Sequence, residues 1–157
     1  MPVMSVTDAA ALAEAHREAG RSVVFTNGVF DLLHPGHVRY LQAARAEGDV
    51  LIVGVNSDRS VRSYKDPSRP LIPELERAEI ISALACVDAA AIFDEDTPDQ
   101  IIRRIHSDVL VKGADWAADA IVGRDTVEAR GGRVIRVAIE QGWSTSAIIG
   151  KIRASKG

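Results

Sequence analysis

The chain has 157 residues, of which 46% are hydrophobic and 26% are charged, and its formal net charge is −3. This length and composition are typical of one globular domain with a hydrophobic core. The small negative charge argues against bulk electrostatic binding to nucleic acid or to an anionic membrane.

The single cysteine, Cys86, has no partner for an internal disulfide, which favours a reducing compartment. The first ten residues, MPVMSVTDAA, lack the basic and apolar regions of a signal peptide, and no apolar run is long enough to span a bilayer. We therefore expect a cytoplasmic protein that uses neither a membrane nor nucleic acid as its partner.

Strand-like and helix-like patterns alternate along the whole chain. The predicted strands are 23–26, 50–55, 89–93, 109–112 and 133–139, and the predicted helices are 9–19, 37–46, 74–84, 97–106, 119–129 and 145–153. Thr7 or Asp8 is expected to cap the first helix, and Thr97 the helix that ends at His106. The alternation predicts an α/β fold with a Rossmann-like, doubly wound, five-stranded parallel sheet and helices on both faces.

Ligands of such sheets bind beyond the carboxyl ends of the strands, so the segment TNGVFDLLHPGH after the first strand is the leading candidate site. Gly28 lets the backbone approach a ligand closely, Pro35 suits the first turn of a helix, and Gly36 keeps that turn open. His34 and His37 share one side of that turn. A helix start with two added imidazole donors indicates a phosphate site.

The two histidines could also have no functional role or could bind a metal. An isolated pair at this spacing is often incidental. A zinc site needs at least a third ligand, and no Cys or His lies at a usual spacing, so no protein-bound metal is predicted. Neither a Walker loop nor a G-x-G-x-x-G turn is present.

The stretch GVFDLLHPGH resembles the His-x-Gly-His motif of the cytidylyltransferase-like nucleotidyltransferases. Further similar segments are VGVNSD at 53–58, Lys65 with SRP at 68–70, ER at 76–77, VKGAD at 111–115 and GWST at 142–145. With EDTP at 95–98, they most resemble the heptose 1-phosphate adenylyltransferases, often one half of a bifunctional heptose kinase/adenylyltransferase. The resemblance implies one nucleotidyltransferase domain over 1–157, with an N-terminal helix in 1–21 and a catalytic core in 22–153.

The resemblance implies transfer of AMP from ATP to D-glycero-β-D-manno-heptose 1-phosphate, which gives ADP-heptose and pyrophosphate for the lipopolysaccharide core. His34 and His37 would contact the nucleotide phosphates and the developing charge, and Lys65 would reach over them. Mg²⁺ would be carried by the ATP phosphates, because that ion keeps its waters and needs few protein ligands. Relatives are often dimers or larger, so a homo-oligomer is expected.

The resemblance also assigns residues to the two ends of the nucleotide. Asn27, Gly28, Phe30 and Gly36 would lie near the phosphates. Asp31 would hold the groups that contact the acceptor phosphate, or a hydrated magnesium ion, or it would instead cap or brace the loop. Arg77 would contact substrate or phosphate, or form a surface salt bridge. The residues expected at the nucleoside end are Gly113, Asp115, Gly142, Ser144 and Thr145.

Three alternatives stay open at this point. Glycerol 3-phosphate cytidylyltransferases carry Arg-Thr-x-Gly-Ile-Ser-Thr near the end, whereas this chain has EQGWST at 140–145, and the missing arginine weakens the case for CTP. Another phospho-alcohol cytidylyltransferase or an FMN adenylyltransferase would use the same chemistry. A nucleotide-binding module without turnover is a further alternative, although it would not need His34, His37 and Lys65.

Overall fold

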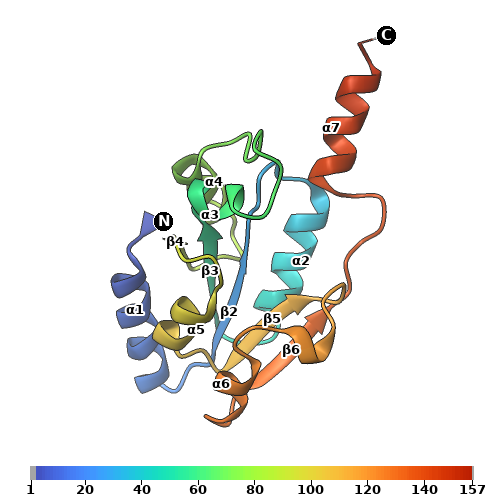
Figure 1. Ribbon diagram of the computed structural model, residues 1–157. Helices are drawn as coiled ribbons and strands as arrows, with labels where there is room; N and C mark the ends of the chain where they lie inside the picture. The colour runs from blue at the N-terminus through green and yellow to red at the C-terminus, as the bar shows by residue number, and fades with distance from the viewer. Residues whose placement is uncertain (1–2, 157) are drawn as a thin grey trace.

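The computed structural model describes residues 3–156, which form one parallel sheet with helices on both faces (Figure 1). The ends of the predicted domain, residues 1–2 and 157, lie outside the described residues. The strands are β1 (Val3–Met4), β2 (Val23–Gly28), β3 (Val50–Asn56), β4 (Ala89–Phe93), β5 (Val109–Gly113) and β6 (Arg133–Val137). The helices are α1 (Val6–Glu18), α2 (Pro35–Arg45), α3 (Asp58–Arg62), α4 (Glu74–Ser82), α5 (Asp99–Ile105), the 3₁₀ turn η1 (Ala118–Ala120), α6 (Arg124–Glu128) and α7 (Thr145–Ala154).

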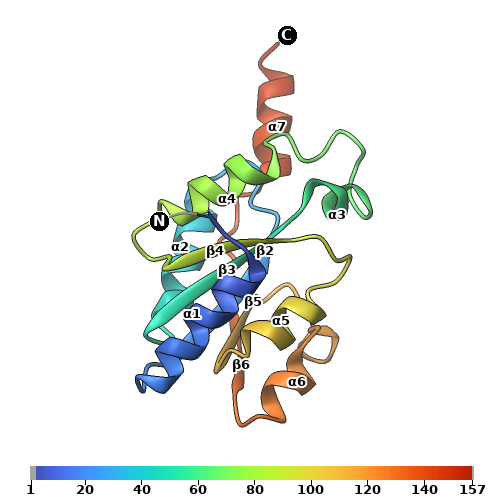
Figure 2. The ribbon, with the colours of Figure 1, turned by 90° about the vertical axis from the view of Figure 1, so that its left-hand side faces the viewer.

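Every residue of β3 is buried, as expected for a central parallel strand covered on both faces. Alternate strand residues face two separate hydrophobic clusters. Phe25 belongs to the cluster that α1 and α5 cover, whereas Val24 belongs to the cluster that α2 and α4 cover. Figure 2 shows α1, α5 and α6 together on the side of the sheet that faces the viewer. The predicted doubly wound α/β fold is confirmed.

The strand order is β1-β4-β3-β2-β5-β6, with all neighbours parallel. From β2 the chain builds outward through β3 and β4, and it then crosses to β5 on the other side of β2. The order therefore reverses between β2 and β5, which is where parallel α/β sheets bind their ligands. Asn27 and Gly28 end β2 at this point, and Lys112 and Gly113 end β5.

The sheet has six strands, because Val3–Met4 pairs in parallel with β4 at the edge. Two residues are too few to give the alternating pattern by which a strand is predicted. The predicted caps are wrong in two places. Ser5, not Thr7 or Asp8, caps α1 by accepting a hydrogen bond from the Asp8 amide (3.1 Å), and α5 begins after Pro98 without a side-chain cap.

The predicted helix 119–129 is divided into η1 and α6, because Gly123 has a φ of +87° and so leaves the right-handed helical region. At the end of the chain, α7 projects beyond the body of the domain in both views (Figures 1 and 2). No helix within residues 3–156 has the length and apolar character needed to cross a bilayer.

Candidate active site

A cavity of about 320 Å³ opens at the carboxyl ends of β2 and β5. Twelve of the fourteen site residues predicted from the sequence line it, and they come from four separate segments of the chain. These residues are Asn27, Gly28, Phe30, Asp31, His34, Gly36, His37, Lys65, Gly113, Asp115, Ser144 and Thr145. The topological switch point therefore gathers almost all of the chemistry that the sequence indicated.

The two histidines stack against each other at the start of α2. Their ring centroids are 3.8 Å apart, with 20° between the ring planes. His34 is the N-cap residue of α2, Pro35 begins the helix, and the His34 carbonyl accepts a hydrogen bond from the His37 amide (2.9 Å). The Phe30 ring meets His37 edge-on at 5.4 Å. The pair is therefore fixed to the first turn of the helix, where free N–H groups favour anions.

Burial favours the neutral form of both imidazoles. Burial lowers the pKa of His37 to about 4, and the neighbouring His34 adds to this effect. Burial also lowers the pKa of His34. The Nδ1 atoms of both rings are buried without a hydrogen-bond partner among the described residues. Neutral rings carry one N–H each, so the pair can offer donors without repelling each other as two cations would.

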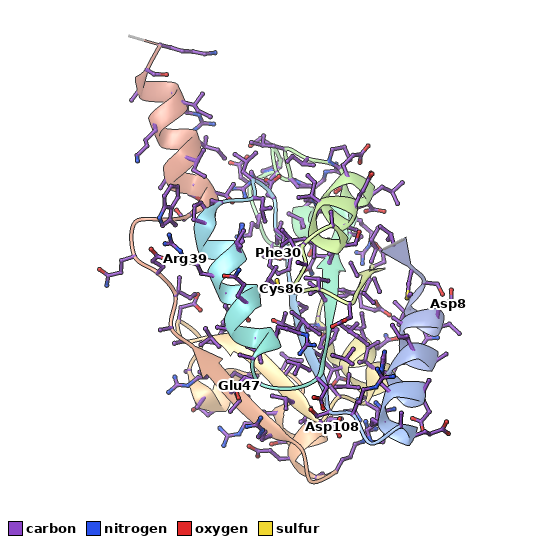
Figure 3. The ribbon with its side chains drawn as sticks, turned by 180° about the vertical axis from the view of Figure 1, so that it is seen from behind. Asp8, Phe30, Arg39, Glu47, Cys86 and Asp108 are labelled. Carbon is purple, nitrogen blue, oxygen red and sulfur yellow. The ribbon has the colours of Figure 1, made fainter. Side chains whose placement is uncertain are left out.

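Two glycines lie where a side chain would press against this pair or its neighbours. A Cβ on Gly36 would lie 2.9 Å from His34 Nδ1 and 3.1 Å from Trp143 Cβ. A Cβ on Gly28 would lie 3.0 Å from the Phe30 ring. Phe30 itself has a φ of +50°, which is uncommon for an aromatic residue and turns its side chain inward beside α2 (Figure 3).

Asp31 braces the neighbouring loop, one of the two roles expected for it. Its buried carboxylate accepts hydrogen bonds from Arg69 Nε (2.6 Å) and from the amides of Leu71 (2.9 Å) and Ile72 (2.9 Å). Burial acts to raise the pKa of Asp31, but these hydrogen bonds outweigh it and the pKa lies below its usual value. The loop that carries Lys65 is therefore anchored at one end beside the histidines.

Arg77 and Gly142 do not line the cavity. Arg77 has no exposed surface, and its guanidinium donates to the carbonyls of Ile72 (2.8 Å) and Asn56 (2.8 Å), to the carbonyl of Val29, and to Asp58 (2.8 Å). It therefore holds the loop before α2 against the end of β3. Arg77 was expected either to contact the ligand or to form a salt bridge at the surface. Both expectations are wrong, because Arg77 is buried and does not line the cavity.

The opposite wall of the cavity is the start of α7. Ser144 caps this helix by accepting a hydrogen bond from the Ala147 amide (3.0 Å), and Thr145 is buried. The Trp143 ring lies nearly parallel to His34 at 6.1 Å. Two helix N-termini thus face one cavity, and both favour a ligand with several negative charges.

Sequence reasoning missed Tyr40, which also lines the cavity. Its hydroxyl lies 2.8 Å from Thr26 Oγ1, and burial raises its pKa to about 12. The i, i+3 spacing from His37 placed it on the same helix face and would have been a usable signal. Within residues 3–156 no group of three or more His, Cys, Asp or Glu side chains is placed to hold a metal ion.

Comparison with known proteins agrees with this geometry. A family model described as cytidylyltransferase-like matches residues 25–151, which include both histidines and both helix starts. The chain belongs to the cytidylyltransferase-like family. The predicted resemblance is therefore confirmed.

Curated proteins similar to this cytidylyltransferase-like chain include two named bifunctional protein HldE. The one from Citrifermentans bemidjiense is 55% identical over 145 residues, and the one from Geobacter metallireducens is 53% identical over 148 residues. These matches cover 92% and 94% of this chain but only 30% of each relative. The chain thus spans less than a third of the length of these relatives.

Solved structures of similar fold include the lipopolysaccharide core biosynthesis protein from Thermoplasma volcanium. It is 30% identical, has a TM-score of 0.65, and the match covers 77% of this chain and 98% of that one. A protein of unknown function from Archaeoglobus fulgidus, at 24% identity and a TM-score of 0.53, shares the fold; its match covers 73% of this chain and 97% of that one.

Proposed function

We propose that this chain transfers AMP from ATP to D-glycero-β-D-manno-heptose 1-phosphate, giving ADP-heptose and pyrophosphate. The observation that supports the reaction class is the stacked pair of imidazoles, His34 and His37, at a helix start inside a cavity. The choice of acceptor is supported by the resemblance to heptose 1-phosphate adenylyltransferases and by the 53–55% identity to the two bifunctional relatives.

The transfer is a single in-line displacement. A phosphate oxygen of the acceptor forms a bond to the α-phosphorus of ATP, the bond from that phosphorus to the bridging oxygen breaks, and pyrophosphate leaves with the electron pair. No protein nucleophile is needed, so catalysis consists of positioning and charge stabilisation. Two imidazole N–H groups and the α2 start supply hydrogen-bond donors for the phosphates as charge shifts toward the leaving group.

The remaining cavity residues position the nucleotide. Lys65 extends from the exposed loop into the cavity wall and would neutralise the phosphates. The N–H groups at the start of α7 would meet the other end of the nucleotide, beside Asp115, whose carboxylate can accept from a ribose hydroxyl. Mg²⁺ would enter as part of the substrate, carried on the triphosphate.

Pyrophosphate release with defined substrate pairs tests the proposal. ATP or CTP would be combined with heptose 1-phosphate, glycerol 3-phosphate or FMN, and we expect release with ATP and heptose 1-phosphate. Release with CTP and glycerol 3-phosphate would instead identify a cytidylyltransferase. Tight nucleotide binding with no release in any combination would identify a binding module.

A further inference from the structure

A second cavity, of about 340 Å³, adjoins the first at the same edge of the sheet. It is lined by Asn27, Asn56, Tyr64, Asp96, Thr97, Pro98, Lys112, Trp116, Ile121 and Val122. Asn27 and Trp116 line both cavities, so the two spaces meet at these side chains. A reaction that joins two substrates needs two adjoining binding spaces. The histidines, Lys65 and the start of α7 line the first cavity, so the second cavity is free for the other substrate.

Lys112 is the single cation among the residues that line this second cavity. Only 8% of its surface is exposed, and its ammonium donates to a neutral partner, the Asn27 side-chain oxygen. Burial lowers the pKa of Lys112 to about 8. A buried cation without a counter-ion is costly, and a bound anion would remove that cost. This points to a negatively charged group in the second cavity.

The lining also includes the Asp96 carboxylate, which pairs with Arg59 (3.0 Å), and its other members suit a polyhydroxylated molecule. The Asn56 amide donates to Ser60 Oγ (3.1 Å), which leaves its side-chain oxygen as an acceptor, and Thr97 and Tyr64 add hydroxyl groups. Ile121 and Val122 provide an apolar side for the carbon skeleton. At about 340 Å³ the cavity has room for a monosaccharide phosphate.

We propose that the second cavity binds the acceptor as a sugar phosphate, with its phosphate between Lys112 and Asn27 and its hydroxyls toward Asn56 and Thr97. This assignment rests on the proposed function and adds the acceptor site to it. Because Lys112 occupies the Asn27 oxygen, the amide nitrogen of Asn27 is left to meet the phosphates at the junction. The attacking oxygen would then start beside the α-phosphorus bound in the first cavity.

Lys112→Met tests this assignment, with Lys112→Arg and Lys65→Met as matched variants. We expect Lys112→Met to raise the KM for heptose 1-phosphate about 10- to 100-fold, the range for a lost hydrogen bond to a charged group, with the KM for ATP within about twofold. Lys112→Arg should recover part of the loss, and Lys65→Met should raise the KM for ATP instead. An increase confined to the KM for ATP, or no change in either KM, would overturn the assignment.

A binding measurement separates this inference from the proposed reaction. Mannose 1-phosphate would be titrated into the wild type and into Lys112→Met without nucleotide, with thermal unfolding as the check on folding. Loss of binding in a folded variant supports the acceptor site even if no pyrophosphate is ever released. Equal binding by both proteins, or no binding by the wild type, contradicts it. Thr97→Val, which leaves the buried charge in place, should weaken binding by less.

Discussion

The helices α2 and α7 both point their N-termini at the cavity, but they are held in very different ways. Leu41 and Ala44 of α2 are fully buried against the sheet. In α7 only Thr145 is buried, Ile152 is 52% exposed, and the helix projects from the domain (Figures 1 and 2). One wall of the site is thus part of the core, and the other wall is attached mainly through its first turn.

This difference separates two requirements of a transfer enzyme. Stabilising charge in a transition state requires donors fixed before the reaction begins, as His34 and His37 are on α2. Binding and releasing a nucleotide is easier where little packing has to be broken, as at α7. The Arg39–Glu140 ion pair joins α2 to the connection before α7, and Figure 3 shows Arg39 on the side of α2 that faces this connection. Both partners are exposed, so this link is weak.

The largest effect is expected from Arg77→Met, which removes the brace beneath the α2 wall. Because the carbonyls of Val29, Asn56 and Ile72 would lose a buried partner, we expect the free energy of unfolding to fall by about 3–5 kcal/mol. Urea unfolding would measure this change, with the exposed Arg39→Met as the control. A loss below about 1 kcal/mol, the range of surface ion pairs, would show that the loop before α2 does not depend on Arg77.

Replacement of either histidine should reduce kcat rather than stability. For His34→Asn and His37→Asn we expect kcat to fall about 100-fold or more, because a preorganised donor to the reacting phosphates is lost. His106→Asn is the matched control. His106 is exposed, ends α5 with a φ of +53°, and lies outside the cavity, and asparagine tolerates that backbone conformation. Full activity in both histidine variants would refute the proposed role of the α2 wall.

Acid should destabilise the α2 wall through His37. Its pKa is about 4 in the folded state and 6.5 as the ordinary value, so the unfolded state binds the proton first as the pH falls. The stabilisation from the neutral ring is complete above pH 6.5 and is lost between pH 6.5 and 4. After allowance for partial exposure it amounts to roughly 1–3 kcal/mol. Unfolding of wild type and His37→Asn at pH 7.5 and 4.5 would measure it, and parallel pH dependences would contradict it.

The smallest effect is expected at the α7 wall. Ser144→Ala removes the cap of α7, which is worth about 1 kcal/mol to the helix. Since α7 is packed so little, we expect nearly unchanged global unfolding, a KM for ATP raised about two- to tenfold, and kcat within about twofold. Ser155→Ala, at the far end of the same helix, is the control. A fall in kcat as large as in the histidine variants would erase the distinction between the two walls.

Local patterns predicted most of the fold. The buried strands and the His-x-Gly-His turn can be recognised from residues that are adjacent in the sequence. The predicted strands therefore agree closely with the observed 23–28, 50–56 and 89–93. What depends on distant contacts was missed. Val3–Met4 forms a strand because it pairs with the open edge of β4. Ser5 rather than Thr7 caps α1 because the helix begins at Val6.

The site shows the same division. Residues after β2 and β5 were located because strand order brings strand ends together, whereas Arg77 was placed at the ligand on resemblance and lies in the interior. Besides Asp58, its partners are backbone carbonyls from three separate segments, and no sequence pattern indicates such contacts. The environment of Lys112, a charge buried beside an amide, likewise emerges only when β2 and β5 are adjacent.

The Asp31 anchor has a consequence for turnover. Lys65 lies on a short span whose start is continuous with α3 and whose end is clamped by Asp31 at Leu71 and Ile72. A span fixed at both ends has few conformations to lose, so under the proposed function its ordering around a triphosphate would cost little entropy. The length of that span would therefore set how far Lys65 can extend over the phosphates.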